Sequence, residues 1–336
     1  MEHIVVYKER GRFGGWPANH GLWKWGNEVV VGFQSCSFKI IDDANHAIDK
    51  TQPRYHLQAR STDGGRTWEI EEKPEIQDWY KISGSKFSNN TFNMTNPNGA
   101  LTFKQHPDKD GSILLFFSTD RCNTWSDPLE VRIFKNRNIE PRIDYIVFDT
   151  RKAICFLTAV KDNGKEGRVF CAQTTDGGQT WQFLSWIGEE IEGFNIMPST
   201  IQLPDGCLLC TTRWQEAGEW GIDTYISDDE GLSWKFHGRV LQHKGLSNPP
   251  SLILLKDGRL CLTYGFRDKP YGIRACFSYD NGKTWKEERI LRDDGGHWDL
   301  GYVRSTELPS GEVLSVYYFC EDKRTERTIE ATIWQP

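Results

Sequence analysis

The chain has 336 residues, a formal net charge of −6 and nine cysteines. The acidic balance gives no electrostatic reason to expect nucleic acid or an anionic membrane as a partner, and no apolar run approaches the roughly 20 residues that span a bilayer. Residues 1–6 lack the basic start and apolar stretch of a signal peptide. Because the cysteines are scattered through apolar patterns, we expect a soluble protein with buried, reduced thiols and a mild preference for the cytoplasm.

Six segments predict inner hairpins in chain order, each with a strand, a polar turn and a second strand. They are residues 22–33, 100–117, 145–160, 199–213, 251–266 and 305–319. Residues 327–334 predict a further strand after the sixth hairpin. The N-terminal segment 4–7 is expected to complete that last sheet as its outer strand, which would close a ring and protect the sheet edges.

A short phrase of the form Ser/Thr-x-Asp-x-Gly-x-Thr/Ser-Trp follows five of these hairpins, with copies starting at residues 61, 118, 174, 227 and 278. Its Asp can accept hydrogen bonds from the backbone N–H groups of a tight turn, its Gly supplies a positive φ, and its Trp packs back as an anchor. In the second copy Cys122 replaces the glycine, so that turn should be strained or differently shaped.

The spacing of the copies, 51 to 57 residues, leaves room for one four-stranded antiparallel sheet per interval, which is typical of propeller blades. No Pro/Ser-rich linker interrupts the repeats. We therefore predict an all-β, six-bladed propeller that forms a single domain over residues 1–336, closed by the N-terminal strand.

The loops opposite the repeated turns should share one face of such a propeller, where a functional site is expected. Arginines dominate this set of residues, and their planar guanidinium groups bind carboxylates in a bidentate manner. The set comprises Arg12, Trp16, His20, Asp42, Asp43, Arg54, Arg142, Arg213, Glu216, Glu219, Arg267, Arg274, Trp298, Asp299, Tyr302 and Arg304.

The repeats resemble the Asp-boxes, or BNR repeats, of the sialidase superfamily, and the resemblance covers essentially the whole chain. Three phrases are similar, in order, to those that carry two arginines of the family's carboxylate-binding triad and its nucleophilic tyrosine. They are Thr212-Arg213-Trp214, Gly272-Ile273-Arg274-Ala275 and Gly301-Tyr302-Val303-Arg304-Ser305. The resemblance implies an exo-acting glycoside hydrolase that cleaves a terminal acidic sugar, with Tyr302 as nucleophile and Arg213 and Arg274 on the substrate carboxylate.

Further site residues are expected around these. Arg12, Arg267, Arg304 and Trp298 are predicted to bind substrate, and the resemblance places the acid/base aspartate at Asp42 or Asp43, of which we take Asp43. No metal-ligand cluster and no phosphate-binding glycine loop is present, so no metal or cofactor is expected.

The chain departs from the family at two places. Met197 occupies the position of the glutamate that activates the tyrosine, for which Glu192, Glu216 or Glu219 could substitute. The Arg-Ile-Pro phrase of the first triad arginine is missing, with Arg12 displaced from its place.

Two other functions therefore stay open. His20, in the phrase Trp16-Pro17-Ala18-Asn19-His20-Gly21, suits a rhamnosidase-like hydrolase or a uronate-polysaccharide lyase, in which an arginine neutralises the uronate carboxylate while His20 or Tyr302 removes the adjacent proton. A non-catalytic glycan-binding propeller is the third reading. All these readings take an acidic oligosaccharide or polysaccharide, or another glycan, as the partner.

Overall fold

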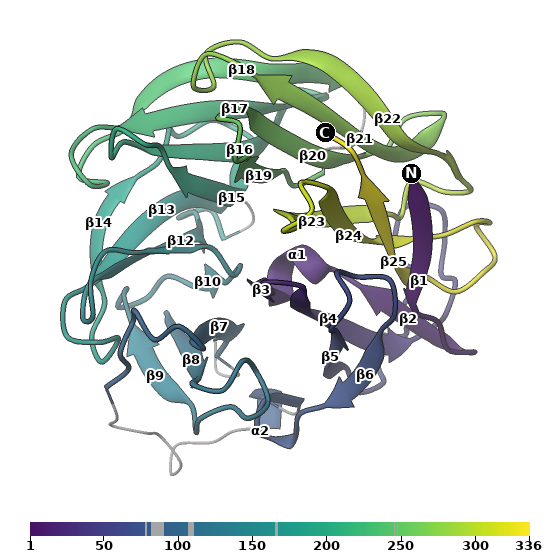
Figure 1. The fold of residues 1–336 in the computed structure, drawn as a ribbon, viewed down its shortest axis with the longest axis horizontal. Helices are drawn as coiled ribbons and strands as arrows, with labels where there is room; N and C mark the ends of the chain where they lie inside the picture. The colour runs from purple at the N-terminus through teal and green to yellow at the C-terminus, as the bar shows by residue number, and fades with distance from the viewer. Residues whose placement is uncertain (78, 82–90, 107–110, 165–166, 245, 247) are drawn as a thin grey trace. The chain divides into compact units, whose positions relative to one another are not determined.

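The computed structural model describes residues 1–77, 79–81, 91–106, 111–164, 167–244, 246 and 248–336 (Figure 1). Strands account for 52% of the chain and helices for 3%, which confirms the predicted all-β class. The described helices are α1 (Pro17–His20), α2 (Pro74–Gln77) and the 3-10 helix η1 (Trp79–Lys81). None of these one-turn helices has the length and apolar character that crossing a membrane requires.

The chain divides into two compact units. Unit 1 contains Met1–Lys73, Gly245–Tyr279 and Trp285–Pro336, and unit 2 contains Pro74–Lys244 and Asp280–Thr284.

The described strands of unit 1 form three antiparallel sheets. One sheet has the order β2 (Arg12–Gly15), β4 (Glu28–Ser37), β5 (Tyr55–Ser61), β6 (Glu69–Glu72), with β3 (Leu22–Trp25) also paired to β4. Another has β19 (Ser251–Leu254), β20 (Leu260–Phe266), β21 (Tyr271–Ser278) and β22 (Lys286–Gly295) in chain order. The remaining sheet has the order β1 (Glu2–Tyr7), β25 (Thr328–Trp334), β24 (Val313–Phe319), β23 (Gly301–Glu307).

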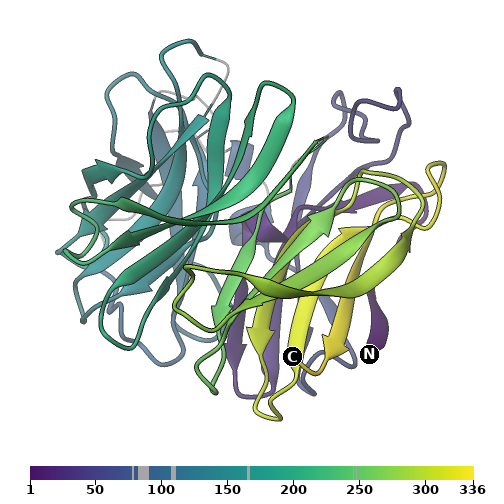
Figure 2. The same ribbon diagram turned by 90° about the horizontal axis from the view of Figure 1, so that it is seen from above.

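The two ends of the chain lie in neighbouring strands of this last sheet. β1 pairs antiparallel with β25, with Ile4 opposite Ala331, and Figures 1 and 2 show the purple N-terminal strand beside the yellow C-terminal one. The predicted outer strand at residues 4–7 is therefore confirmed, as is the predicted strand at residues 327–334.

The described strands of unit 2 form a three-stranded and a nine-stranded sheet. The smaller sheet contains β7 (Ala100–Gln105), β8 (Ser112–Ser118) and β9 (Leu129–Arg132). The larger contains β10 (Ile139–Glu140), β11 (Tyr145–Val147), β12 (Ala153–Val160), β13 (Gly167–Thr174), β14 (Gln182–Trp186), β15 (Phe194–Gln202), β16 (Leu208–Glu216), β17 (Glu219–Ser227) and β18 (Lys235–Lys244). One parallel bridge, Arg168 to Asn195, joins β13 to β15, so this sheet consists of two antiparallel groups.

Each of the six predicted hairpins is present as a pair of antiparallel strands. The pairs are β3–β4, β7–β8, β11–β12, β15–β16, β19–β20 and β23–β24. The turn of the second hairpin, residues 107–110, lies outside the described residues.

The repeated phrase forms the expected hydrogen-bonded turn. In the first copy, Asp63 Oδ1 accepts from the backbone N–H of Arg66 (3.0 Å) and Thr67 (2.9 Å), and Oδ2 accepts from Thr67 Oγ1 (2.7 Å). Trp68 Nε1 donates to the carbonyl of Gly65 at 2.8 Å, and Gly65 has a φ of 93°. Trp68 thus anchors a turn that requires a positive φ at the position of Gly65, which glycine adopts without strain.

The second copy keeps this turn at a conformational cost. Cys122 has a φ of 63°, where glycine would be unstrained. Asp120 still accepts hydrogen bonds from the backbone N–H of Thr124 (3.0 Å) and from its hydroxyl (2.7 Å). The predicted strain is confirmed, whereas the shape of the turn is unchanged.

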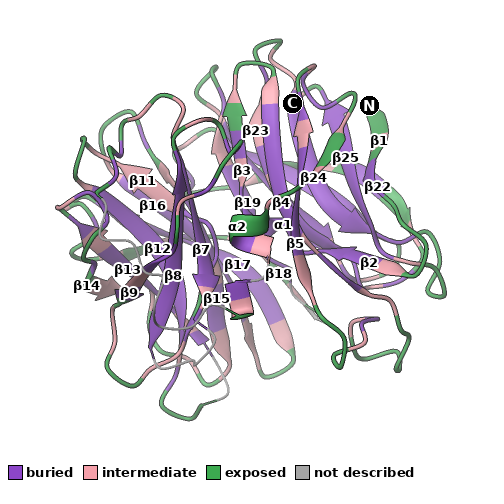
Figure 3. Cartoon of the chain, turned by 90° about the horizontal axis from the view of Figure 1, so that it is seen from below, coloured by how far each residue is buried: buried purple, intermediate pink, exposed green. Residues whose placement is uncertain are grey.

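The strands are mostly buried on both faces. Every residue of β8 (SILLFFS) and of β24 (VLSVYYF) is buried, as the purple strands of Figure 3 show, and such strands have nearly continuous apolar sequences. All nine cysteines are free thiols, and all except Cys207 are buried, as expected.

Candidate active site

β23 begins with two residues of unusual backbone conformation that position Tyr302. Gly301 and Tyr302 have φ of 103° and 52°, and the register between β23 and β24 shifts between Gly301 and Arg304. The Asn248 side chain fixes this bulge, because its Nδ2 donates to the Leu300 carbonyl (2.9 Å) and its Oδ1 accepts from the Tyr302 N–H (2.9 Å). A left-handed tyrosine is strained, and strain of this kind is concentrated at functional sites.

Asp299, three residues before Tyr302, is fully buried and binds four groups. Its Oδ1 accepts from the Tyr318 hydroxyl (2.8 Å) and lies 2.5 Å from Nδ1 of His46. Its Oδ2 accepts from Arg327 Nε (3.2 Å) and from the backbone N–H of Ala47 (3.3 Å). Segments from both ends of the chain therefore meet at one carboxylate.

The surroundings of Asp299 keep it ionised. Burial opposes its ionisation, but the hydrogen bond and charge of His46, followed by the charges of Arg327 and Arg267, hold the pKa of this carboxyl well below its usual range. Burial, followed by the charge of Asp299, raises the pKa of Tyr318 well above its usual value. Tyr318 is thus a neutral donor to a fixed anion.

His46 is the member of this cluster that reaches solvent. Its side chain is 31% exposed, whereas that of Asp299 is 0% exposed. Three aromatic rings surround the imidazole, with centroid distances of 5.2 Å to Trp16, 5.5 Å to Trp298 and 6.4 Å to Phe13. Since Nδ1 faces the buried carboxylate, Nε2 is the atom through which His46 can exchange a proton with a ligand.

Arg267 connects Tyr302 to the same cluster. Its Nε and Nη2 donate to the Leu300 carbonyl at 3.2 and 3.1 Å, and Nη2 also donates to the Tyr318 hydroxyl at 3.0 Å. Its guanidinium carbon lies 5.2 Å from the Trp298 ring centroid and 5.6 Å from that of Tyr302. The predicted residues Arg267, Trp298 and Tyr302 are therefore neighbours, and His46 packs on the same tryptophan.

Asp43, the predicted acid/base, contacts this cluster through its backbone. The indole Nε1 of Trp298 donates to the Asp43 carbonyl at 2.6 Å. The Asp43 side chain is 77% exposed and lies 3.7 Å from Lys323. Its carboxylate is therefore a solvated group, unlike that of Asp299.

His20 lies at the C-terminal end of α1, paired with another histidine. Its Nδ1 is 3.2 Å from Nδ1 of His56, and both rings are buried. Two further predicted arginines lie on strands of unit 1. Arg12, on β2, donates to the Ser35 hydroxyl and carbonyl, both at 2.9 Å. Arg304, on β23, is half-buried.

The two arginines that the resemblance assigned to the substrate carboxylate lie in different units. Arg274, in unit 1, is buried; its Nη1 donates to the carbonyl of Arg292 (2.6 Å) and its Nη2 to that of Pro270 (3.3 Å). Arg213, in unit 2, is buried with its guanidinium carbon 5.3 Å from the ring centroid of Phe194. Part of the donor capacity of Arg274 is thus occupied by backbone carbonyls.

Met197 lies in a bulge like that of Tyr302. It has a φ of 57°, and the register of β15 against β16 shifts between Ile196 and Ser199. Its backbone N–H donates to Thr158 Oγ1 at 3.1 Å. A thioether at this position can accept no proton, so any base must come from elsewhere.

Sequence reasoning missed His46, Arg327 and Asn248. His46 lies in a loop rich in Asp, Asn and Ala without periodicity, and Arg327 was read only as the start of a strand. The sequence held one signal for this centre: Asp299 lies only three residues before Tyr302, which places a carboxylate beside the bulge at Gly301 and Tyr302.

Comparisons with known proteins agree with the fold. A family model described as a BNR repeat-like domain matches residues 108–327. No curated protein matches the chain. A crystal structure of a protein of unknown function from Dyadobacter fermentans is similar with a TM-score of 0.76 and 20% identity, over 100% of this chain and 98% of that one.

Two enzymes are among the other similar structures. The GH93 α-L-arabinofuranosidase of Fusarium graminearum has a TM-score of 0.67 and 12% identity, over 100% of this chain and 98% of that one. The NanB sialidase of Streptococcus pneumoniae has a TM-score of 0.64 and 12% identity, over 98% and 70%. At such identities the likeness shows the fold, that of sialidase-like propellers. Because the family model covers more than half of its length, the chain belongs to the BNR repeat-like domain family.

Proposed function

We propose that the protein is a glycoside hydrolase that cleaves a terminal sugar from a glycan. The observation that carries this proposal is the pair formed by buried Asp299 and partly exposed His46, set among tryptophans. Tyr318, which donates to Asp299, packs against Tyr302. Aromatic rings stack on sugar faces, and a fixed imidazole transfers protons near neutral pH. Glycosidases of the same fold among the similar structures support the reaction class.

We also propose that the fold is one propeller domain over residues 1–336. The six antiparallel groups, two of them in the nine-stranded sheet, would be its six blades, of which the group β7–β9 has three described strands. β1 would close the ring as the outer strand of the last blade. The regular spacing of the repeated turns supports this arrangement.

The proposed reaction follows the logic of a nucleophile, a histidine and an orienting carboxylate. The Tyr302 phenol oxygen displaces the leaving oxygen at the anomeric carbon: the new carbon–oxygen bond forms as the glycosidic bond breaks, His46 Nε2 takes the phenol proton, and the leaving oxygen receives a proton from His46. Water then displaces the Tyr302 oxygen from the anomeric carbon, giving its proton to His46, which returns one to the Tyr302 oxygen. Asp299 stays ionised and stabilises the transient imidazolium, which is the role for which its environment suits it.

The substrate is proposed to carry a carboxylate, as in an acidic sugar. Arg267 supports this, because its cation lies over the faces of Trp298 and Tyr302, where a substrate anion would meet it. Arg12, Arg274 and Arg304, which lie in the same unit as Arg267, remain proposed substrate ligands.

A panel of sialylated, uronate-containing and arabinose-containing oligosaccharides, analysed by mass spectrometry, tests the proposal. We expect release of a saturated monosaccharide with the mass of one added water. An unsaturated product would instead indicate a lyase, and binding without cleavage a glycan-binding propeller. Either result would overturn the proposal.

Two variants test the assigned residues on the cleaved substrate. His46→Asn and Tyr302→Phe should each lower kcat by about 10²–10⁴-fold, whereas His237→Asn, on β18 of unit 2, should leave it unchanged. Full activity of His46→Asn would show that another group transfers the proton. Near-ultraviolet circular dichroism of each variant separates lost chemistry from lost folding.

A further inference from the structure

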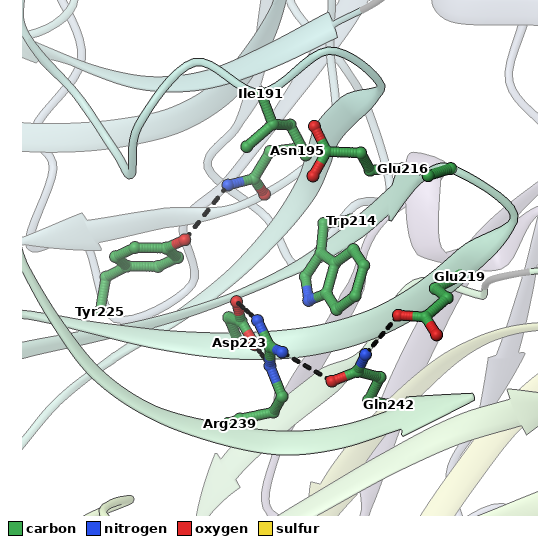
Figure 4. Close-up of a pocket in the computed structure, with 10 residues that line it drawn as sticks. Ile191, Asn195, Trp214, Glu216, Glu219, Asp223, Tyr225, Arg239 and Gln242 are labelled. Carbon is green, nitrogen blue, oxygen red and sulfur yellow. Dashed lines mark hydrogen bonds and ion pairs between the residues drawn. The ribbon is translucent and has the colours of Figure 1, made fainter. Parts of the chain in front are cut away.

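Unit 2 contains a small pocket that involves no residue of the proposed catalytic centre. Its volume is about 260 Å³, below the ~300–1,000 Å³ of sites for drug-sized ligands. Figure 4 shows the side chains that line it, which come from β15, β16, β17, β18 and the loop before β15. They are Ile191, Asn195, Trp214, Glu216, Glu219, Asp223, Tyr225, Arg239 and Gln242, with Ala217 beside them.

One wall of the pocket is a chain of hydrogen bonds. Arg239 binds Asp223 through two contacts, Nε to Oδ1 (2.8 Å) and Nη2 to Oδ2 (3.1 Å). Its Nη1 donates to Gln242 Oε1 (2.7 Å), and Gln242 Nε2 donates to Glu219 Oε2 (2.5 Å). The guanidinium also covers the Trp214 ring at 4.7 Å. This wall is therefore formed before any ligand binds, which lowers the entropic cost of binding.

Two residues that line the pocket each have a buried polar atom without a hydrogen-bond partner among the described residues. The atoms are Oδ1 of Asn195 and Nε1 of Trp214, and the two side chains are only 3% and 8% exposed. In Figure 4 the Asn195 oxygen lies on the Trp214 side of its amide, and the indole nitrogen of Trp214 points toward Asp223. A buried acceptor or donor without a partner is costly, so a ligand that supplies both a donor and an acceptor would relieve the cost.

The charges of the pocket exclude an anion. Glu216, Glu219 and Asp223 face a single guanidinium, that of Arg239, which Asp223 already neutralises. Burial, followed by the charge of Asp223, raises the pKa of Tyr225 to about 12, so its hydroxyl is neutral. The carboxylates accept hydrogen bonds from hydroxyl groups, and each hydroxyl both donates and accepts.

We propose that this pocket binds one uncharged sugar residue. A hydroxyl group of the sugar would donate to Asn195 Oδ1, another would accept from Trp214 Nε1, and the carboxylates would accept from further hydroxyls. The volume suits one monosaccharide ring. The charge of this site differs from that of the proposed catalytic centre, which contains the guanidinium group of Arg267.

Saturation-transfer NMR tests the proposal. The neutral probes are the methyl glycosides of glucose, galactose, mannose and arabinose, and the anionic probe is N-acetylneuraminate. We expect saturable millimolar binding of at least one methyl glycoside and none of the acid at the same site. Trp214→Phe keeps the ring under Arg239 but removes the N–H, and it should weaken binding about tenfold or more. Asn195→Ala should do the same.

Trp220→Phe is the matched control: the buried Trp220 on β17 also has an indole nitrogen that finds no partner in the described part of the chain, but it does not line the pocket. It should bind as wild type does, and so should His46→Asn, which separates this site from the catalytic proposal. Absence of saturable binding, or equal losses in Trp214→Phe and Trp220→Phe with unchanged circular dichroism, would overturn the proposal and leave a pocket filled by water alone.

Discussion

Replacing Asp299 by asparagine tests whether the buried carboxylate organises its surroundings. The Asp299→Asn change keeps the shape of the side chain but removes its charge and turns one acceptor into a donor. That donor would face either His46 and Tyr318 or Arg327, all of which point hydrogen-bond donors at this carboxylate. The variant should therefore lose stability as well as the orientation of His46.

The size of the loss follows from the contacts. Charge-assisted hydrogen bonds contribute about 1.5–3 kcal/mol each, and removing one partner of a buried ion pair costs about 3–5 kcal/mol because the other charge stays buried. Arg327, at 2% exposure, would be that uncompensated charge. Asparagine retains one acceptor oxygen, so we expect a decrease of about 3–5 kcal/mol in the free energy of unfolding.

Urea denaturation followed by tryptophan fluorescence and by near-ultraviolet circular dichroism measures this difference. Coincident transitions by the two probes justify a single free energy. Asp43→Asn is the control, since its side chain is 77% exposed and the change should stay within about 0.5 kcal/mol. A loss below about 1 kcal/mol in Asp299→Asn would refute the reasoning that Asp299 is a paired, buried anion.

Three further changes have expected outcomes. Gly301→Ala should lower the urea midpoint more than Gly311→Ala does. Both glycines have positive φ, 103° and 85°, but a Cβ at residue 301 would lie 2.4 Å from Asn248 Nδ2, whereas one at residue 311 would meet open space. Equal shifts would contradict this clash. Asp176→Ala should lower the free energy of unfolding by about 1–3 kcal/mol, because the Asp176 carboxylate closes a turn with four hydrogen bonds. Thermal denaturation measures the effect as a lower Tm, and an unchanged Tm would show that the turn forms without this carboxylate. Burial, followed by the charge of a nearby arginine, lowers the pKa of His297. Its contribution to the free energy of unfolding is therefore present above the unfolded pKa of about 6.5 and is lost as the pH falls, by at most about 1.4 kcal/mol per pH unit. His297→Gln should flatten the pH dependence of the urea midpoint between pH 7 and 5, and an unaltered slope would assign that dependence to other groups.

The sequence predicted the strands well because each is an apolar run bounded by turn residues. The pattern at residues 305–319, for example, appears as β23 and β24, and the repeated Asp turn forms because its hydrogen bonds are local. The residues that determine a strand or one of these turns lie within a few positions of each other in the sequence, so the sequence alone predicts them. The conformation of Cys122 followed from the same local geometry.

The centre around Asp299 could be predicted only in part. Tyr302 and Trp298 were marked by their place before an inner strand, but His46 lies 253 residues from the carboxylate that it binds. No periodicity or turn signal connects the two. The contacts of Arg274 were equally hidden, because the carbonyls that it binds come from Arg292 on the neighbouring strand β22 and from Pro270 in the loop before β21.

The pairing of β1 with β25 governs when the protein can finish folding. During synthesis β1 (Glu2–Tyr7) is made long before its partner strand β25 (Thr328–Trp334). β1 must therefore wait, with its edge unpaired, until those residues have left the ribosome. Truncation before Thr328 would leave β1 without its partner strand, so such variants should aggregate rather than give a shortened working protein.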